Sequence, residues 1–89
     1  MEQKFIAAWE ENRAKAEKLG VRMRPLDLKN AQRILSGTRL SDGFGDLAAK
    51  GALKLSLEAL AVDKRFTALF TDEQANEALI RLLEAGYKF

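Results

Sequence analysis

The stretch TDEQANEALIRLLEAGY, residues 71–87, decides the fold class of this chain. Thr71 and Gln74 have the spacing of a capping box, in which two side chains satisfy the free amide groups at a helix start. Apolar residues then recur at three- and four-residue intervals, namely Ala75, Ala78, Leu79, Leu82 and Leu83. Glu77 and Arg81 add a favourable i, i+4 pair. We therefore predict an amphipathic helix here, with the apolar stripe buried.

The same helical punctuation continues through the rest of the chain. The expected helices cover about residues 2–19, 28–35, 42–50, 57–62, 63–70 and 71–85. The expected N-terminal caps are Asp27, Ser41 or Asp42, Ser56, Asp63 and Thr71. A single helix over residues 46–62 is the competing interpretation of the middle of the chain. We favour a break because Gly51 and Ser56 stand where stop and start signals belong.

An extended connector, residues 21–26, should join the first two helices. Pro25 disfavours a helical backbone at the residue before it, so the first helix ends upstream. Val21 and Met23 alternate with Arg22 and Arg24, which is typical of an extended segment with one buried side.

The composition of the chain fits one small helical domain. The 89 residues, of which 47% are hydrophobic, suffice for a single domain over 1–89. Neither a repeat nor a strand-rich region is apparent in the sequence. We predict an all-α, compact single domain of four to six mostly short helices. No apolar run approaches a bilayer span, and the charged N-terminal residues are unlike a signal peptide, so we expect a cytoplasmic protein without membrane contact.

The residue types in this chain disfavour catalysis. The absence of cysteine and histidine removes thiol chemistry, the usual zinc ligands and the commonest acid–base group. Residues 37–46 contain glycines, hydroxyls and an arginine that could cradle an anion, although a flexible capped loop is the preferred interpretation. Asp42 and Asp46 are the only plausible acid–base or cation-binding couple, without a calcium-loop pattern. We predict no catalytic residue, no cofactor and no metal ligand.

Charge is unevenly distributed along the chain. Residues 21–45 carry a net charge of +3, whereas residues 71–89 carry −2. The basic residues of the middle segment are Arg22, Arg24, Lys29, Arg33 and Arg39. They form either a solvated surface or a patch that binds a nucleic-acid backbone. A helix-turn-helix is disfavoured because its recognition helix, near residues 42–50, would present carboxylates to an anionic groove.

Aromatic residues lie near both ends of the chain. Trp9, Tyr87 and Phe89, together with Phe5, meet either in the core or on an exposed surface. Tryptophan and tyrosine are enriched where proteins contact each other, so Trp9, Tyr87 and Phe89 are candidate partner-binding residues.

These observations favour binding over catalysis. We expect a non-enzymatic small helical binding protein, acting as a protein–protein interaction or regulatory accessory module, with a protein partner or self-association. The alternative is a nucleic-acid-binding protein that uses the basic patch in residues 22–39.

Overall fold

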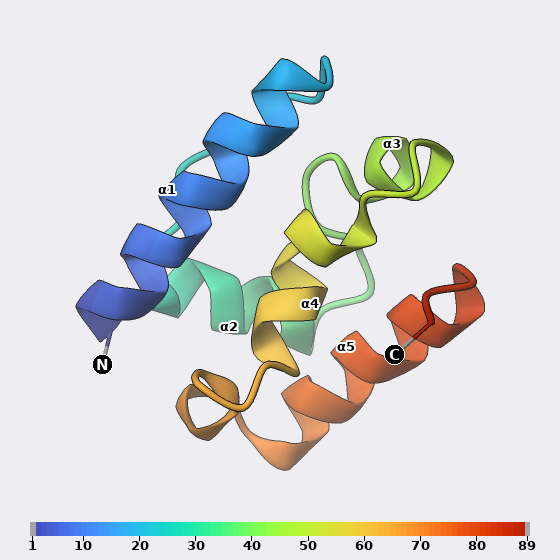
Figure 1. Ribbon diagram of the computed structural model, residues 1–89. Helices are drawn as coiled ribbons and strands as arrows, with labels where there is room; N and C mark the ends of the chain where they lie inside the picture. The colour runs from blue at the N-terminus through green and yellow to red at the C-terminus, as the bar shows by residue number, and fades with distance from the viewer. Residues whose placement is uncertain (1, 89) are drawn as a thin grey trace.

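The computed structural model describes residues 2–88, a range that contains helices and loops and no β-strand (Figure 1). In chain order the helices are α1 (Glu2–Lys18), α2 (Leu28–Ser36), α3 (Phe44–Ala49), α4 (Leu57–Ala61) and α5 (Asp72–Glu84). Two 3-10 turns, η1 (Leu53–Leu55) and η2 (Thr67–Leu69), flank α4. The radius of gyration is 11.7 Å, close to the value of about 12 Å expected for a folded chain of this length. The predicted all-α, compact single domain is confirmed.

The short helix α4 occupies the centre of the molecule. Figure 1 shows α1 along one side, α5 along the other, and α2 behind them. Both α2 and α4 pack against α5 and against α1. The large side chains at the centre of this arrangement are fully buried and include Phe5, Trp9, Leu35, Leu47, Leu57 and Leu82. Within residues 2–88, no helix has the length and apolar character that a membrane span requires.

Three predicted N-terminal caps are present. The Asp27 side chain accepts from the amide of Asn30 at 2.7 Å, and the Ser56 hydroxyl accepts from the amide of Ala59 at 3.1 Å. Thr71 forms the predicted reciprocal capping box with its partner three residues later. Residues 46–62 are broken into α3, η1 and α4, as the favoured interpretation required. Local side-chain chemistry therefore sets these helix starts.

The predicted start of the third helix is wrong. The helix begins at Phe44, and its N-cap is Gly43 with φ of +75°, without a side-chain cap. Ser41 does not cap this helix because its hydroxyl instead donates to the buried carboxylate of Glu58 at 2.6 Å. The helix expected at 63–70 reduces to a turn that contains η2, with Phe66 and Phe70 buried beside it.

Part of the predicted buried stripe on α5 is also wrong. Ala78 and Leu82 are buried, but the Leu83 side chain is 55% exposed. Arg81, expected only as the partner of Glu77, is instead 5% exposed on the inner side of the helix. The inner face of α5 therefore differs from the predicted apolar stripe, because it includes the charged side chain of Arg81 and excludes Leu83.

Position 43 requires glycine for two reasons, namely its left-handed backbone conformation and the side chains that lie close to its Cα. A Cβ at this position would lie 2.8 Å from Val21 Cγ1 and 3.2 Å from Met23 Cγ. Gly20, with φ of +84°, has open space where its Cβ would be. Substituting Gly20 would therefore introduce backbone strain alone, whereas substituting Gly43 would introduce both strain and crowding.

We predict that Gly43→Ala lowers the free energy of unfolding by about 2–4 kcal/mol, because left-handed strain and overpacking add. Gly20→Ala, the matched control, should cost about 1–2 kcal/mol through strain alone. Urea unfolding followed by circular dichroism measures both. Equal losses for the two variants would show that the packing of Val21 against Gly43 is unimportant.

Candidate functional site

A hollow of about 460 Å³ lies between the connector, α2 and the loop after α2. Its basic side chains are Arg24, Arg33 and Arg39, and its apolar side chains are Pro25, Leu26, Ile34 and Leu40. Asn30, Gly37, Thr38 and Asp42 complete the lining. We call it the basic hollow, since three of the five predicted basic residues line it with a single carboxylate.

The first wall of the basic hollow is the extended connector, which α1 holds in place. The Trp9 indole Nε1 donates to the carbonyl of Arg24 at 2.9 Å, and Arg13 Nε donates to the carbonyl of Met23 at 2.7 Å. Val21 and Met23 are buried, as the alternating pattern predicts. The intervening arginine side chains consequently point toward solvent, and Arg24 forms an exposed ion pair with Asp42 at 3.4 Å.

The second wall combines α2 with residues 37–41. Arg33, in the last turn of α2, and Arg39 are exposed. No carboxylate among residues 2–88 forms an ion pair with either guanidinium. Leu40 is 54% exposed between them and the connector. Two unneutralised cations therefore lie beside apolar surface in one depression.

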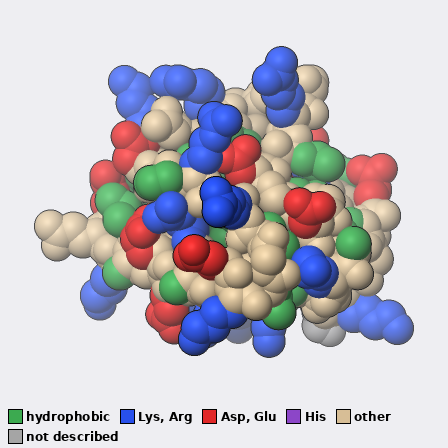
Figure 2. Space-filling view, turned by 90° about the horizontal axis from the view of Figure 1, so that it is seen from above, with side chains coloured by type: hydrophobic (Ala, Val, Ile, Leu, Met, Phe, Trp, Pro, Cys, Tyr) green, Lys and Arg blue, Asp and Glu red, His purple; other side chains and the backbone are tan. Residues whose placement is uncertain are grey.

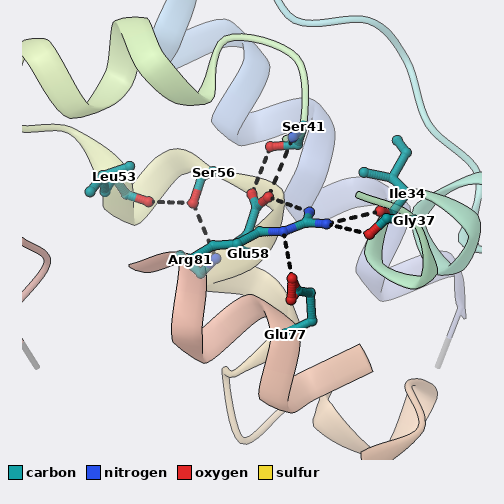
Figure 3. A network of polar contacts seen from close by, with 9 residues as sticks. Ile34, Gly37, Ser41, Leu53, Ser56, Glu58, Glu77 and Arg81 are labelled. Atoms are coloured by element: carbon teal, nitrogen blue, oxygen red, sulfur yellow. Dashed lines mark hydrogen bonds and ion pairs between the residues drawn. The ribbon is translucent and has the colours of Figure 1, made fainter. Parts of the chain in front are cut away.

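A buried ion pair fixes both ends of this loop (Figure 3). Arg81 Nη1 donates to Glu58 Oε2 at 3.1 Å, with side-chain exposures of 4% and 0%. Arg81 Nη2 donates to the carbonyl of Gly37 at 2.9 Å and to that of Ile34 at 3.4 Å. At the other end, the Ser41 hydroxyl and amide donate to Glu58 at 2.6 and 3.4 Å. Thr38, Arg39 and Leu40 are thus presented outward from two anchored ends.

The positioning roles of Glu58 and Arg81 were not predicted from the sequence. Arg81 lies one helical turn after Ala78 and Glu77, and its Nε is 3.6 Å from Glu77 Oε1, an ion-pair distance rather than a hydrogen bond. The expected i, i+4 pair therefore exists but is secondary to the contact with Glu58. In the sequence Arg81 adjoins Leu82, and Glu58 stands among Leu57, Ala59 and Leu60, but these apolar neighbours do not indicate that the two charged side chains meet.

The other two predicted basic residues do not line the hollow itself. Arg22 lines an adjoining depression that shares Arg24, Pro25 and Asp42 with the hollow, and Lys29 is exposed on α2. Figure 2 shows basic, acidic and apolar side chains interspersed on the face it views, rather than a continuous basic stripe. Three of the five predicted basic residues thus line one hollow, Arg22 lines the depression beside it, and Lys29 lines neither.

The terminal aromatic residues have different environments. Trp9 is completely buried, so its prediction as a partner-contacting residue is wrong, and its indole instead holds the connector. Tyr87 is half-buried and packs against the core. Phe89 lies outside the described residues. The sequence could not separate these cases because burial depends on contacts with distant residues.

No protein-family model, curated protein or solved structure matches this chain.

The residues of the site suit binding to a surface better than they suit holding a metal ion. Asp42, one of the two carboxylates considered for a cation, pairs with Arg24. In the described part of the chain, no three histidine, cysteine or acidic residues gather as metal ligands. What the geometry provides is a preformed surface with cationic and apolar parts.

We predict that Arg81→Met destabilises the fold by about 3–5 kcal/mol, because it leaves the Glu58 carboxylate buried without its cation. Adding Glu58→Met should recover part of this loss, since an apolar pair removes the unpaired charge. Chemical denaturation measures Arg81→Met, Glu58→Met and the double variant, and hydrogen exchange of the 37–41 amides should speed up in the double variant. A double variant as unstable as the two single losses combined would contradict this coupling.

Proposed function

We propose that this chain is a non-enzymatic binding protein that uses the basic hollow to bind an acidic, leucine-containing segment of a protein partner. The observation that carries the proposal is the convergence of Arg24, Arg33 and Arg39 around apolar side chains. Arginine is enriched in protein interfaces, where its planar guanidinium can bind a carboxylate through two hydrogen bonds.

The apolar lining supports a peptide ligand of mixed character. Leu26 and Ile34 are half-buried at the base of the hollow, while Leu40 projects from the loop. A leucine or isoleucine side chain of a partner would lose water against this surface, which contributes about 25 cal/mol for each Å² of apolar area buried. Carboxylates flanking that side chain would lie near Arg33 and Arg39.

The anchoring of both walls supports binding without a large ordering cost. The connector is held by Trp9 and Arg13, and the loop is held by Glu58 and Arg81. A surface that is already ordered before association loses less conformational entropy when it binds. Preorganisation of this kind favours a defined ligand over diffuse charge attraction.

A protein segment fits the hollow better than a nucleic acid does. Binding of single-stranded nucleic acid commonly uses aromatic side chains on which bases stack. The residues lining the hollow include no aromatic side chain, and they include the carboxylate of Asp42. Lys29, another of the predicted nucleic-acid contacts, does not line the hollow.

The remaining parts of the proposal rest on composition. The lack of histidine and cysteine supports a role without catalysis. The lack of cysteine also fits a reducing compartment, which supports a cytoplasmic location.

Fluorescence anisotropy with a labelled helical peptide rich in glutamate and leucine tests the proposal. We expect saturable binding that weakens with salt, and a loss of roughly tenfold or more in affinity for Arg33→Glu combined with Arg39→Glu. The matched control is Lys54→Glu combined with Lys64→Glu, which changes net charge equally at exposed positions that line neither the hollow nor the depression beside it. This control should lose much less affinity.

Equal weakening by the two pairs of substitutions would contradict a defined site, because it would indicate attraction by net charge alone. A peptide in which serine replaces leucine should bind more weakly; unchanged affinity would refute the apolar contribution. Tighter binding to oligothymidine than to the acidic peptide would favour the nucleic-acid alternative and overturn the proposal.

A further inference from the structure

The outward face of α5 carries the chemistry that the basic hollow is proposed to bind. Glu73, Asn76, Ile80 and Leu83 recur at three- and four-residue intervals, so they share one face of the helix. Ile80 and Leu83 are 50% and 55% exposed, and Glu84 adjoins them. This face is thus an acidic helix surface with two large aliphatic side chains at its centre.

The two surfaces are complementary in charge and in apolar character. The α5 face has Glu73 and Glu84 around Ile80 and Leu83, and Asp72 extends the acidic end. The basic hollow has Arg33 and Arg39 without carboxylate partners in residues 2–88, beside the exposed Leu40. Docking the two would pair unneutralised charges and remove exposed aliphatic surface from water.

The α5 face cannot enter the hollow of its own molecule. Its inner face is fixed to α2, because Gln74 Nε2 donates to Ser36 Oγ at 2.8 Å and to the Gln32 carbonyl at 3.2 Å. The buried Arg81 adds its hydrogen bonds to the carbonyls at the end of α2. The helix therefore presents Ile80 and Leu83 away from the molecule that carries them.

We infer that the outward face of α5 in one copy of this chain docks into the basic hollow of a second copy. The inference rests on the proposed function, since it assigns an occupant to the same hollow. The two surfaces share no residue, so a dimer formed through one such head-to-tail contact retains one free hollow and one free α5 face. Self-association also competes with an acidic partner for the hollow, which makes partner binding depend on protein concentration.

Complementation between two variants tests the head-to-tail contact. The face variant carries Ile80→Lys and Leu83→Lys, and the hollow variant carries Arg33→Glu and Arg39→Glu. Sedimentation velocity from roughly 10 µM to 1 mM should show the average mass of the unmodified chain rising with concentration. Each variant alone should self-associate roughly tenfold or more weakly, so its average mass rises only at correspondingly higher concentration. An equimolar mixture should form a one-to-one dimer, because the face variant retains a hollow and the hollow variant retains an α5 face.

A control variant and a salt titration test whether the self-association is specific to these two surfaces. The control variant is Leu19→Lys. Leu19 is an aliphatic residue that is 42% exposed and belongs to neither of the two surfaces, so this variant should self-associate like the unmodified chain. Raising the salt concentration from about 50 mM to about 500 mM should weaken assembly several-fold, since the exposed charges are screened. Circular dichroism of all variants establishes that the substituted chains are folded.

The outcomes separate this inference from the proposed function. A chain that stays monomeric throughout overturns the inference, as does self-association that persists in both variants or a mixture that fails to form the dimer. The acidic peptide is titrated into the face variant in parallel, because its hollow is intact. Peptide binding without self-association leaves the proposed function standing, and the absence of both refutes both.

Discussion

The buried ion pair between Glu58 and Arg81 is the interaction on which the arrangement of the other elements depends. Removing two charges from water costs several kcal/mol for each ion, so such a pair is stabilising only when hydrogen bonds satisfy its remaining atoms. Here Glu58 accepts from both the hydroxyl and the amide of Ser41, and Arg81 donates to two carbonyls at the end of α2. Arg81 Nε alone, among the buried side-chain polar atoms of residues 2–88, has no hydrogen bond, and the Glu77 carboxylate 3.6 Å away compensates for its charge. The pair therefore joins α4, α5, the end of α2 and the following loop.

This bonding explains how very short helices hold a defined position. Helix α4 spans five residues and α3 spans six, lengths at which an isolated helix is not stable in water. Glu58 on α4 is bound from two sides, and Leu57 and Leu60 on the same helix are buried. Tertiary contacts thus supply the stability that helix propensity alone does not provide.

The same contacts connect the core to the surface proposed to bind a partner. The loop that carries Arg39 and Leu40 is anchored at Gly37 and Ser41, and the connector that carries Arg24 is anchored from α1. Both walls of the basic hollow are consequently set by buried or partly buried hydrogen bonds, while its charged side chains remain exposed. A change in the core can therefore alter the shape of the hollow without changing a residue that lines it.

The sequence by itself determined the fold class, most helix starts and the extended connector. These features are local, because a cap such as Asp27 or Thr71 bonds to a residue three positions away. Only the tertiary structure decided that Arg81 is buried while Leu83 is exposed, that Ser41 binds Glu58 rather than capping α3, and that Trp9 holds the connector. It also decided which arginines converge on one hollow. Those outcomes depend on partners distant in the chain, and burial and hydrogen bonding between such partners leave no periodic signal in the sequence.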